Sequence, residues 1–306
     1  MEKISVVVPA YNEEKAVGMV VDEVQKALAG KYDFEVIVID DGSTDQTYAV
    51  AKQTGATVVK HERNSGKVAG ISTGVEHATG SVIVLMDADY TYPARYIPQL
   101  VEALSGGADL VLGSRMEYGM SSIPAFNRIG NLLLSLMISY IGCMHVSDGQ
   151  TGYRAFRKKD FEKLHVKAEG LEYETKMTVK AAKNGYNIVE IPIEYRPRIG
   201  KSKLNPFRDG YRMAKSLFSI LLSETSFITK TFLIPTPVFL LAGIGFGIVS
   251  VVEKIEHGVL EHQYYPLLAV FLILFSMQLF SLGMVVDFLT KKLNRIDEKL
   301  RKVQSK

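Results

Sequence analysis

The chain has 306 residues, with 36 lysines and arginines against 33 aspartates and glutamates and a formal net charge of +3. This length accommodates one large domain, or a domain with a smaller part, and from so balanced a charge we expect no nucleic acid partner. The single cysteine, Cys143, excludes an internal disulfide and suits a reducing compartment.

The N-terminal part alternates short apolar runs with segments of helical pattern as far as Val111. Residues 4–8 lack the long apolar region of a signal peptide and meet Pro9 early, so we expect a first strand there and a cytoplasmic folded domain. Strands are predicted at residues 4–8, 36–39, 57–59, 82–86 and 110–112. Strands that alternate with helices indicate right-handed βαβ units, and therefore an α/β fold with a doubly wound sheet. The loop at residues 9–14 lacks the G-x-G-x-x-G pattern, which argues against NAD or FAD.

Two carboxylates, Asp87 and Asp89, follow the apolar run at residues 82–86. Five apolar residues in succession predict a strand of a parallel sheet buried on both faces, and ligands bind beyond the carboxyl ends of such strands. Side chains at i and i+2 point the same way in extended backbone, so both carboxylates can share one hard cation, Mg²⁺ or Mn²⁺, which suits a diphosphate. A solvated turn is the alternative for so short a motif.

A second acidic group, Asp40 and Asp41, ends the run at residues 36–39. Carboxylates there can accept hydrogen bonds from a base N–H or a ribose hydroxyl. The following residues, 43–45, also suit the N-cap of the next helix. Lys67 lies in a glycine-containing loop before a helix, where it could contact a phosphate or the nucleotide, or remain solvated.

Arg115 and Arg128 are candidates for phosphate binding, because a guanidinium binds phosphate with two hydrogen bonds. The apolar segment 132–141 is too short to span a membrane and predicts an interfacial helix, at the membrane surface or packed beneath the membrane-spanning segments, or alternatively a core helix. Residues 195–203 form a basic loop broken by glycine and proline that could close over an anionic substrate. The spacing of apolar and basic residues over 207–221 predicts an amphipathic helix on anionic headgroups.

Two segments, 232–252 and 266–286, contain no charged residue and are long enough to cross a bilayer. Acidic residues prevail in the connector and basic residues follow the second segment, so the positive-inside rule places both chain ends in the cytoplasm. A core hairpin of a soluble protein is the alternative. Gly243 and Gly247 in the first segment could pack the hairpin within one chain, join two chains in an oligomer, or reflect the general frequency of glycine in spans.

Several short motifs follow one another along the chain: residues 6–13, Asp40-Asp41-Gly42-Ser43, Asp87-Ala88-Asp89, Gly113-Ser114-Arg115, Asn127-Arg128, Thr151-Gly152-Tyr153-Arg154 and residues 203–210. Their order resembles family 2 glycosyltransferases of the GT-A fold, in the branch that uses polyprenyl phosphates, including the archaeal dolichyl-phosphate hexose synthases. The resemblance covers essentially the whole chain. It implies a GT-A catalytic domain at 1–204, an amphipathic interfacial helix at 205–231, two transmembrane helices at 232–288 and a basic cytoplasmic tail at 289–306.

The resemblance also implies site residues. Those for the nucleotide sugar are Pro9, Tyr11, Glu13, Asp41, Asp87, Asp89, Lys201 and Lys203, with Asp87 and Asp89 as metal ligands. Asp40 and Lys67 are added to this site from the position of the residues themselves, as argued above. Asp89, Arg115 and Arg128 would be catalytic, the arginines holding phosphates of donor and acceptor. The implied reaction is the inverting transfer of a hexose from a nucleotide diphosphate sugar to dolichyl or polyprenyl phosphate at the lipid bilayer.

One position departs from the pattern, because mannose synthases of this branch commonly have glutamine where this chain has Thr91. UDP-glucose, UDP-N-acetylglucosamine and GDP-mannose therefore all remain candidate donors. A processive polysaccharide synthase would carry more membrane helices and a Q-x-x-R-W element, which this tryptophan-free chain lacks. A membrane-tethered nucleotide-sugar binder without activity is the alternative outside enzymes.

Overall fold

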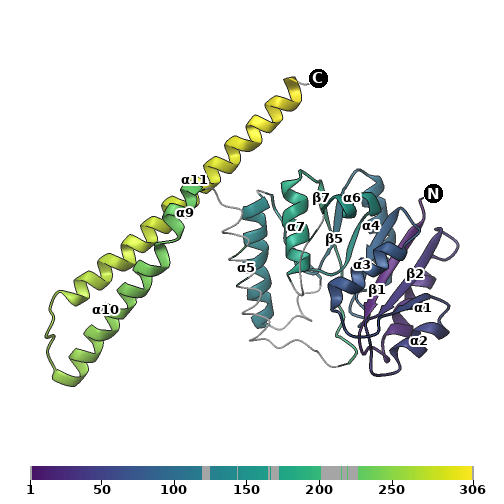
Figure 1. The fold of residues 1–306 in the computed structure, drawn as a ribbon, viewed down its shortest axis with the longest axis horizontal. Coiled ribbons are helices and arrows are strands. Elements are labelled where there is room, and N and C mark those ends of the chain that lie inside the picture. The colour runs from purple at the N-terminus through teal and green to yellow at the C-terminus, as the bar shows by residue number, and fades with distance from the viewer. Residues whose placement is uncertain are drawn as a thin grey trace. The chain divides into compact units, whose positions relative to one another are not determined.

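The computed structural model describes residues 2–118, 125–142, 144–164, 166, 172–200, 215, 219 and 227–304. The chain divides into two compact units, Met1–Leu217 and Phe218–Lys306 (Figure 1). The four-part division expected from the sequence stays a prediction. The boundary at 204 and most of the amphipathic helix expected at 207–221 lie outside the described residues.

Among the described residues of the first unit, seven strands form one sheet, in the order β3-β2-β1-β4-β6-β5-β7. They are β1 (Ile4–Ala10), β2 (Phe34–Asp40), β3 (Thr57–Lys60), β4 (Val82–Leu85), β5 (Leu110–Ser114), β6 (Arg154–Arg157) and β7 (Ile188–Pro192). All five predicted strands are present, which confirms the α/β class. However, β6 runs antiparallel to both β4 and β5, so the expectation of a parallel sheet was wrong at this strand. Because β6 begins and ends with arginine, it lacks the apolar run that marks the other central strands.

Helices connect and cover the strands of the first unit. They are α1 (Val17–Leu28), α2 (Thr47–Gln53), α3 (Lys67–His77), the 3-10 turn Ala94–Tyr96, α4 (Ile97–Ser105), α5 (Ala125–Gly142), α6 (Lys158–Leu164) and α7 (Tyr173–Lys183). Strand β1 is buried on both faces, since Val6 and Val7 point to opposite sides and neither is exposed to solvent. On one side α3 approaches so closely that a Cβ on Gly74 would lie 2.2 Å from Val7 Cγ1. This packing fixes the start of α3, and with it Lys67, beside the carboxyl ends of β1 and β4.

Helix α5 contains the apolar segment that was predicted to lie at the membrane surface or in the core. It packs beside α7 (Figure 1), and Ile138 is fully buried, where a Cβ on Gly149 would come within 2.3 Å of its Cδ1. On the other face Leu132 and Leu136 each expose more than half of their surface. The helix therefore has one face in the core of the first unit and one apolar face toward solvent, and its membrane contact stays a prediction.

The second unit contains α9 (Phe227–Leu233), α10 (Thr236–His257) and α11 (Tyr265–Gln304), with α10 and α11 packed side by side (Figure 1). Two stretches, Ile228–His257 and Tyr265–Thr290, are long and apolar enough to cross a membrane. They contain both segments predicted to span. Only 6% and 17% of their most apolar windows are buried within the protein, which is unlike the core hairpin of a soluble protein.

Candidate active site

The candidate site lies where β1, β2 and β4 end. Parallel pairing places Ala10 beside Asp40 at the ends of β1 and β2, and Val7 beside Leu85 in β4. Asp41, Asp87 and Asp89 follow the ends of β2 and β4, as predicted from their positions after apolar runs, and Glu13, which the family resemblance implied, lies in the loop after β1. The edge of the sheet thus gathers acidic side chains from three separate loops.

Asp89 is 7% exposed and held by its own loop. Its Oδ1 accepts hydrogen bonds from Thr91 Oγ1 at 2.6 Å and from the Thr91 backbone N–H at 3.1 Å, and its Oδ2 lies 3.2 Å from Arg198 Nη1. Burial and the nearby Asp87 raise the pKa of Asp89 above its ordinary value, although Thr91 and Arg198 act in the opposite direction. Thr91, the position that departs from the mannose synthases, therefore acts on the Asp89 carboxylate by a hydrogen bond.

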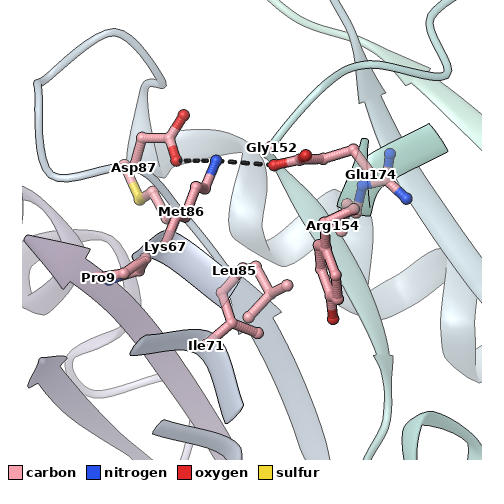
Figure 2. Close-up of a pocket in the computed structure, with 10 residues that line it drawn as sticks. Pro9, Lys67, Ile71, Leu85, Met86, Asp87, Gly152, Arg154 and Glu174 are labelled. Atoms are coloured by element: carbon pink, nitrogen blue, oxygen red, sulfur yellow. Dashed lines mark ion pairs between the residues drawn. The ribbon is translucent and has the colours of Figure 1, made fainter. Parts of the chain in front are cut away.

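Asp87 pairs with a lysine from another loop (Figure 2). Lys67 Nζ lies 2.7 Å from Asp87 Oδ1 and 2.8 Å from Glu174 Oε1, which comes from the first turn of α7. Loss of hydration would lower the pKa of Lys67, but Asp87 and Glu174 together raise it well above its ordinary value. Sequence reasoning missed Glu174; its only trace was a polar run at residues 170–175 without an evident structural purpose.

The two aspartates at the end of β2 differ in their surroundings. Asp41 accepts three hydrogen bonds from the loop before α3: from His61 Nδ1 at 2.7 Å, Ser65 N at 2.9 Å and Gly66 N at 2.8 Å. Asp40 is fully buried; its Oδ1 accepts from the Ser43 N–H, and its Oδ2 has no hydrogen-bond partner among the described residues. Asp41 is thus occupied in shaping the loop, and Asp40 retains the free acceptor.

The segment that follows β7 approaches the same acids. Arg198 contacts both Glu13 Oε1 and Asp89 Oδ2, and Arg196 makes two hydrogen bonds to Glu23 at 2.8 and 2.9 Å. This segment is the described part of the basic loop predicted to close over an anion. Lys201 and Lys203 lie outside the described residues.

Comparison with known proteins identifies this arrangement. Residues 5–165 match the model of glycosyl transferase family 2, more than half of the chain. The chain belongs to glycosyltransferase family 2. It is 33% identical over 223 residues to a dolichyl-phosphate hexose transferase of Haloferax volcanii, covering 73% of this chain and 96% of the relative.

Further relatives agree with that assignment. The chain is 30% identical over 240 residues to a UDP-N-acetylglucosamine–dolichyl-phosphate N-acetylglucosaminyltransferase of Methanococcus voltae, covering 69% of this chain and 94% of the relative. A crystal structure of glucosyl-3-phosphoglycerate synthase from Mycobacterium tuberculosis, in complex with Mn²⁺, UDP and glucosyl-3-phosphoglycerate, is similar in fold. Its TM-score is 0.58 at 25% identity, over 73% of this chain and 80% of that one. The fold is therefore GT-A, as expected.

The predicted phosphate arginines of this glycosyltransferase have different surroundings. Arg115 is 9% exposed and makes two hydrogen bonds to Asp148, from Nε at 2.7 Å and from Nη2 at 2.8 Å. Burial would lower the pKa of Arg115, but Tyr92 and Asp148 raise it well above its ordinary value. Arg128 lies in the first turns of α5, half-buried. The structure thus commits two nitrogens of Arg115 to Asp148, which sequence reasoning did not anticipate.

The remaining predicted residues line the edges of the site. Pro9 lies beside Lys67 and Asp87 in the lining of a small pocket (Figure 2). Tyr11 follows β1 directly and is half-buried. Both positions agree with the nucleotide-binding role that the family resemblance implies, which stays a prediction.

The donor set fits a hard divalent cation. Asp87 and Asp89 come from one short loop. Asp87 pairs with Lys67 through Oδ1, and Asp89 accepts both Thr91 hydrogen bonds at Oδ1, whereas its Oδ2 contacts Arg198. Carboxylate oxygens are the ligands that Mg²⁺ and Mn²⁺ prefer. Two cations of the chain itself, Lys67 and Arg198, contact these acids. A cluster of carboxylates attracts such cations for the same reason that it attracts a divalent metal.

Proposed function

We propose that this protein is an inverting hexosyltransferase that moves a sugar from a nucleotide diphosphate to dolichyl or polyprenyl phosphate. The observation that carries the proposal is the acidic pair Asp87 and Asp89 at the end of β4 in a chain that also contains two helices of membrane-spanning length. A soluble donor site and a membrane anchor in one chain suit a soluble donor and a lipid acceptor. The names of the archaeal relatives support the same acceptor class.

On the donor side, Asp87 and Asp89 would bind a divalent cation, which neutralises charge on a leaving diphosphate when bound. The unpartnered Asp40 Oδ2 would accept a hydrogen bond from the base or ribose, because a buried carboxylate oxygen without a partner is costly. Pro9, Tyr11 and Glu13 would border the nucleoside. Lys201 and Lys203 would follow Arg198 into the site on the closing segment.

On the acceptor side, a lipid monophosphate is already anionic near pH 7 and needs no strongly tuned general base. The protein's task is then positioning and charge: Arg128, on the helix that exposes Leu132 and Leu136, would hold the acceptor phosphate near the membrane surface. Arg115, although paired with Asp148, would contribute positive charge near the phosphates of the substrates. Attack from the face opposite the diphosphate gives inversion at the anomeric carbon.

The membrane arrangement belongs to this proposal. Both predicted spans lie in the second unit, and lysines and arginines follow the second span while glutamates prevail in the connector. The positive-inside rule then gives a multi-pass cell-membrane protein with the catalytic unit in the cytoplasm, where nucleotide sugars are made.

The test is a donor panel. Purified full-length protein in detergent is incubated with dolichyl phosphate, Mg²⁺ or Mn²⁺ and radiolabelled UDP-glucose, UDP-N-acetylglucosamine or GDP-mannose. We expect label from one donor to enter a chloroform-soluble product, and we expect excess EDTA to abolish it. Label that stays water-soluble with every donor, while nucleotide sugar binds, would favour a binder without activity; a long water-soluble polymer would favour a processive synthase.

A further inference from the structure

A row of alternating charges begins at Asp87. Asp87 contacts Lys67 at 2.7 Å, and Lys67 contacts Glu174 at 2.8 Å (Figure 2). Arg154, which lines the same pocket, is fully buried and makes no ion pair within 4.0 Å among the described residues. Burial lowers the pKa of Arg154, and Glu174 is the largest of the charges that oppose this. Glu174 therefore compensates two cations, one by contact and one at longer range.

Backbone contacts hold this row in place. Arg154 donates from Nε to the Thr151 carbonyl at 2.8 Å and from Nη2 to the Gly149 carbonyl at 2.8 Å. The loop that it fixes contains Gly152, where an added Cβ would lie 2.9 Å from Asp87 Oδ2 and 3.1 Å from Lys67 Nζ. The loop thus closes one side of the Asp87–Lys67 pair and restricts where both side chains can lie.

The geometry bears on what Lys67 does. A lysine that binds phosphate directly needs N–H donors free to reach it, but here two carboxylates within 2.8 Å engage two of the three donors of the ammonium. A lone cation in contact with a metal-binding carboxylate would also repel the metal. Glu174 removes this difficulty, because the Lys67–Glu174 pair donates a hydrogen bond to Asp87 and adds no net charge beside it.

We infer that Lys67 and Glu174 are positioning residues for the metal carboxylate Asp87, with Glu174 acting on the metal site only through Lys67. The inference rests on the proposed function, since it assumes that Asp87 binds a divalent cation. It assigns to Lys67 a role other than the nucleotide contact expected from the sequence. It also assigns Glu174 a positioning role that neither the sequence analysis nor the family assignment had given to this residue.

The test uses binding of Mn²⁺ alone, measured by electron paramagnetic resonance on the full-length protein in detergent. Glu174→Gln leaves the Lys67 charge uncompensated, so Mn²⁺ affinity should fall on the order of 10-fold, as for other partners that orient metal ligands. Glu174→Asp keeps the charge and should bind Mn²⁺ more tightly than Glu174→Gln. In a Lys67→Met background there is no lysine charge to compensate, so adding Glu174→Gln should lower Mn²⁺ affinity by much less than it does in the wild type.

Controls separate failure of this inference from failure of the proposed function. Asp87→Asn should lose Mn²⁺ binding; if it binds Mn²⁺ as the wild type does, the metal assignment itself is wrong. Glu172→Gln, two residues before Glu174 and paired with Lys176 at 3.2 Å, should bind Mn²⁺ normally. Two results count against the inference if Asp87→Asn loses Mn²⁺ binding as expected. An equal loss of Mn²⁺ affinity from Glu174→Gln with and without Lys67 would show that Glu174 acts on the metal directly. Unchanged Mn²⁺ affinity in Glu174→Gln would show that Glu174 has no role at the metal site. Either result overturns the inference, and unfolding temperatures of all variants identify any that fail to fold.

Discussion

Asp89 combines burial with hydrogen bonds from a single neighbouring residue. Thr91 donates to Asp89 Oδ1 from both its hydroxyl and its backbone N–H, which sets the orientation of the carboxylate without any other part of the chain. Asp87, two residues earlier, depends instead on Lys67 and Glu174 from α3 and α7. The two predicted metal ligands are thus oriented in different ways, one locally and one by tertiary contacts.

Replacement of Asp89 tests the metal assignment at its locally supported ligand. Asp89→Asn should lower kcat by about 100-fold or more, since charge stabilisation by a bound metal contributes several kcal/mol. The asparagine oxygen can still accept from Thr91, so the unfolding temperature should change little. Asp22→Asn, at an exposed position of α1, is the matched control. Near-normal turnover in Asp89→Asn, or full wild-type activity in excess EDTA, would contradict the assignment.

Gly152 tests how tightly Asp87 must be placed. A Cβ there would press on Asp87 Oδ2 at 2.9 Å, and the carboxylate must then move by a few tenths of an ångström. Because small displacements of reacting groups are costly, Gly152→Ala should lower kcat/KM by about 10- to 100-fold. The contacted atoms are ends of side chains that can shift, so the unfolding temperature should fall only slightly. Gly106→Ala, whose new Cβ would make ordinary contacts of 3.4 Å or more, should leave activity unchanged; equal activity in both variants would contradict the expectation.

At the scale of the elements, one carboxylate joins the N-terminal parts of β1 and β2 to the turn before β4. Glu35 Oε1 accepts hydrogen bonds from Ser5 Oγ at 2.6 Å, from Thr79 N at 2.7 Å and from Thr79 Oγ1 at 2.8 Å. Burial by itself would raise the pKa of Glu35, but these donors and Lys3 bring it below its ordinary value of 4.5. The edge of the sheet opposite the site therefore depends on an ionised glutamate.

The lowered pKa gives a pH dependence of stability. A carboxyl group whose pKa is lower in the folded state stabilises the fold above pH 4.5, and this contribution is lost as the pH falls through 4.5 and below the folded value. Glu35→Gln should therefore lose about 1.5–3 kcal/mol of stability at pH 7, seen as a lower unfolding temperature. The difference from wild type should shrink by pH 3.5, whereas Glu102→Gln, at an exposed position of α4, should resemble wild type throughout. A difference that stays constant with pH would contradict the explanation.

At the scale of the whole molecule, the second unit shows how its two long helices pack. A Cβ on Gly243 would lie 2.8 Å from Ile273 Cγ1 and 3.0 Å from the Ala269 carbonyl oxygen of α11. Gly247 lies farther away, 3.8 Å from Ala269 Cβ, and Gly245 has nothing within 4 Å. Of the three alternatives for the glycine motif, the structure places Gly243 at a contact within one chain, where small residues allow close approach in lipid.

Leucine at these positions tests the hairpin. Gly243→Leu should separate α10 from α11, lower the unfolding temperature in detergent and reduce activity, with the oligomeric state unchanged. Gly245→Leu is the matched control, because its side chain meets open space, and it should resemble wild type. Size-exclusion chromatography with light scattering and thermal unfolding provide the two measurements. Loss of a wild-type dimer in Gly243→Leu would show that this face joins two chains, and an unaltered unfolding temperature would show that it joins nothing.

Features carried by short stretches of sequence could be predicted well. The five strands that begin the fold and both apolar stretches of α10 and α11 are recognised by runs of apolar residues. Burial on both faces imposes that composition on a strand, and the length of an uncharged run marks a helix long enough to cross a membrane. The acids Asp87 and Asp89 were placed correctly at the end of a strand because their position along the chain determines their place at the sheet edge. Strand β6 could not be recognised in this way, since it has arginine at both ends.

The partners of the charged residues depended on the tertiary structure. Lys67 and Glu174, or Arg115 and Asp148, meet only because α3, α7 and the loop before β6 pack beside the ends of β4 and β5. No local sequence pattern specifies such pairs, because the residues next to a charged side chain in the sequence are the same whether that side chain is solvated or forms an ion pair. The sequence by itself therefore determined the class of fold, the acidic edge and the apolar hairpin, whereas only the packing of distant segments decided which cation orients which acid.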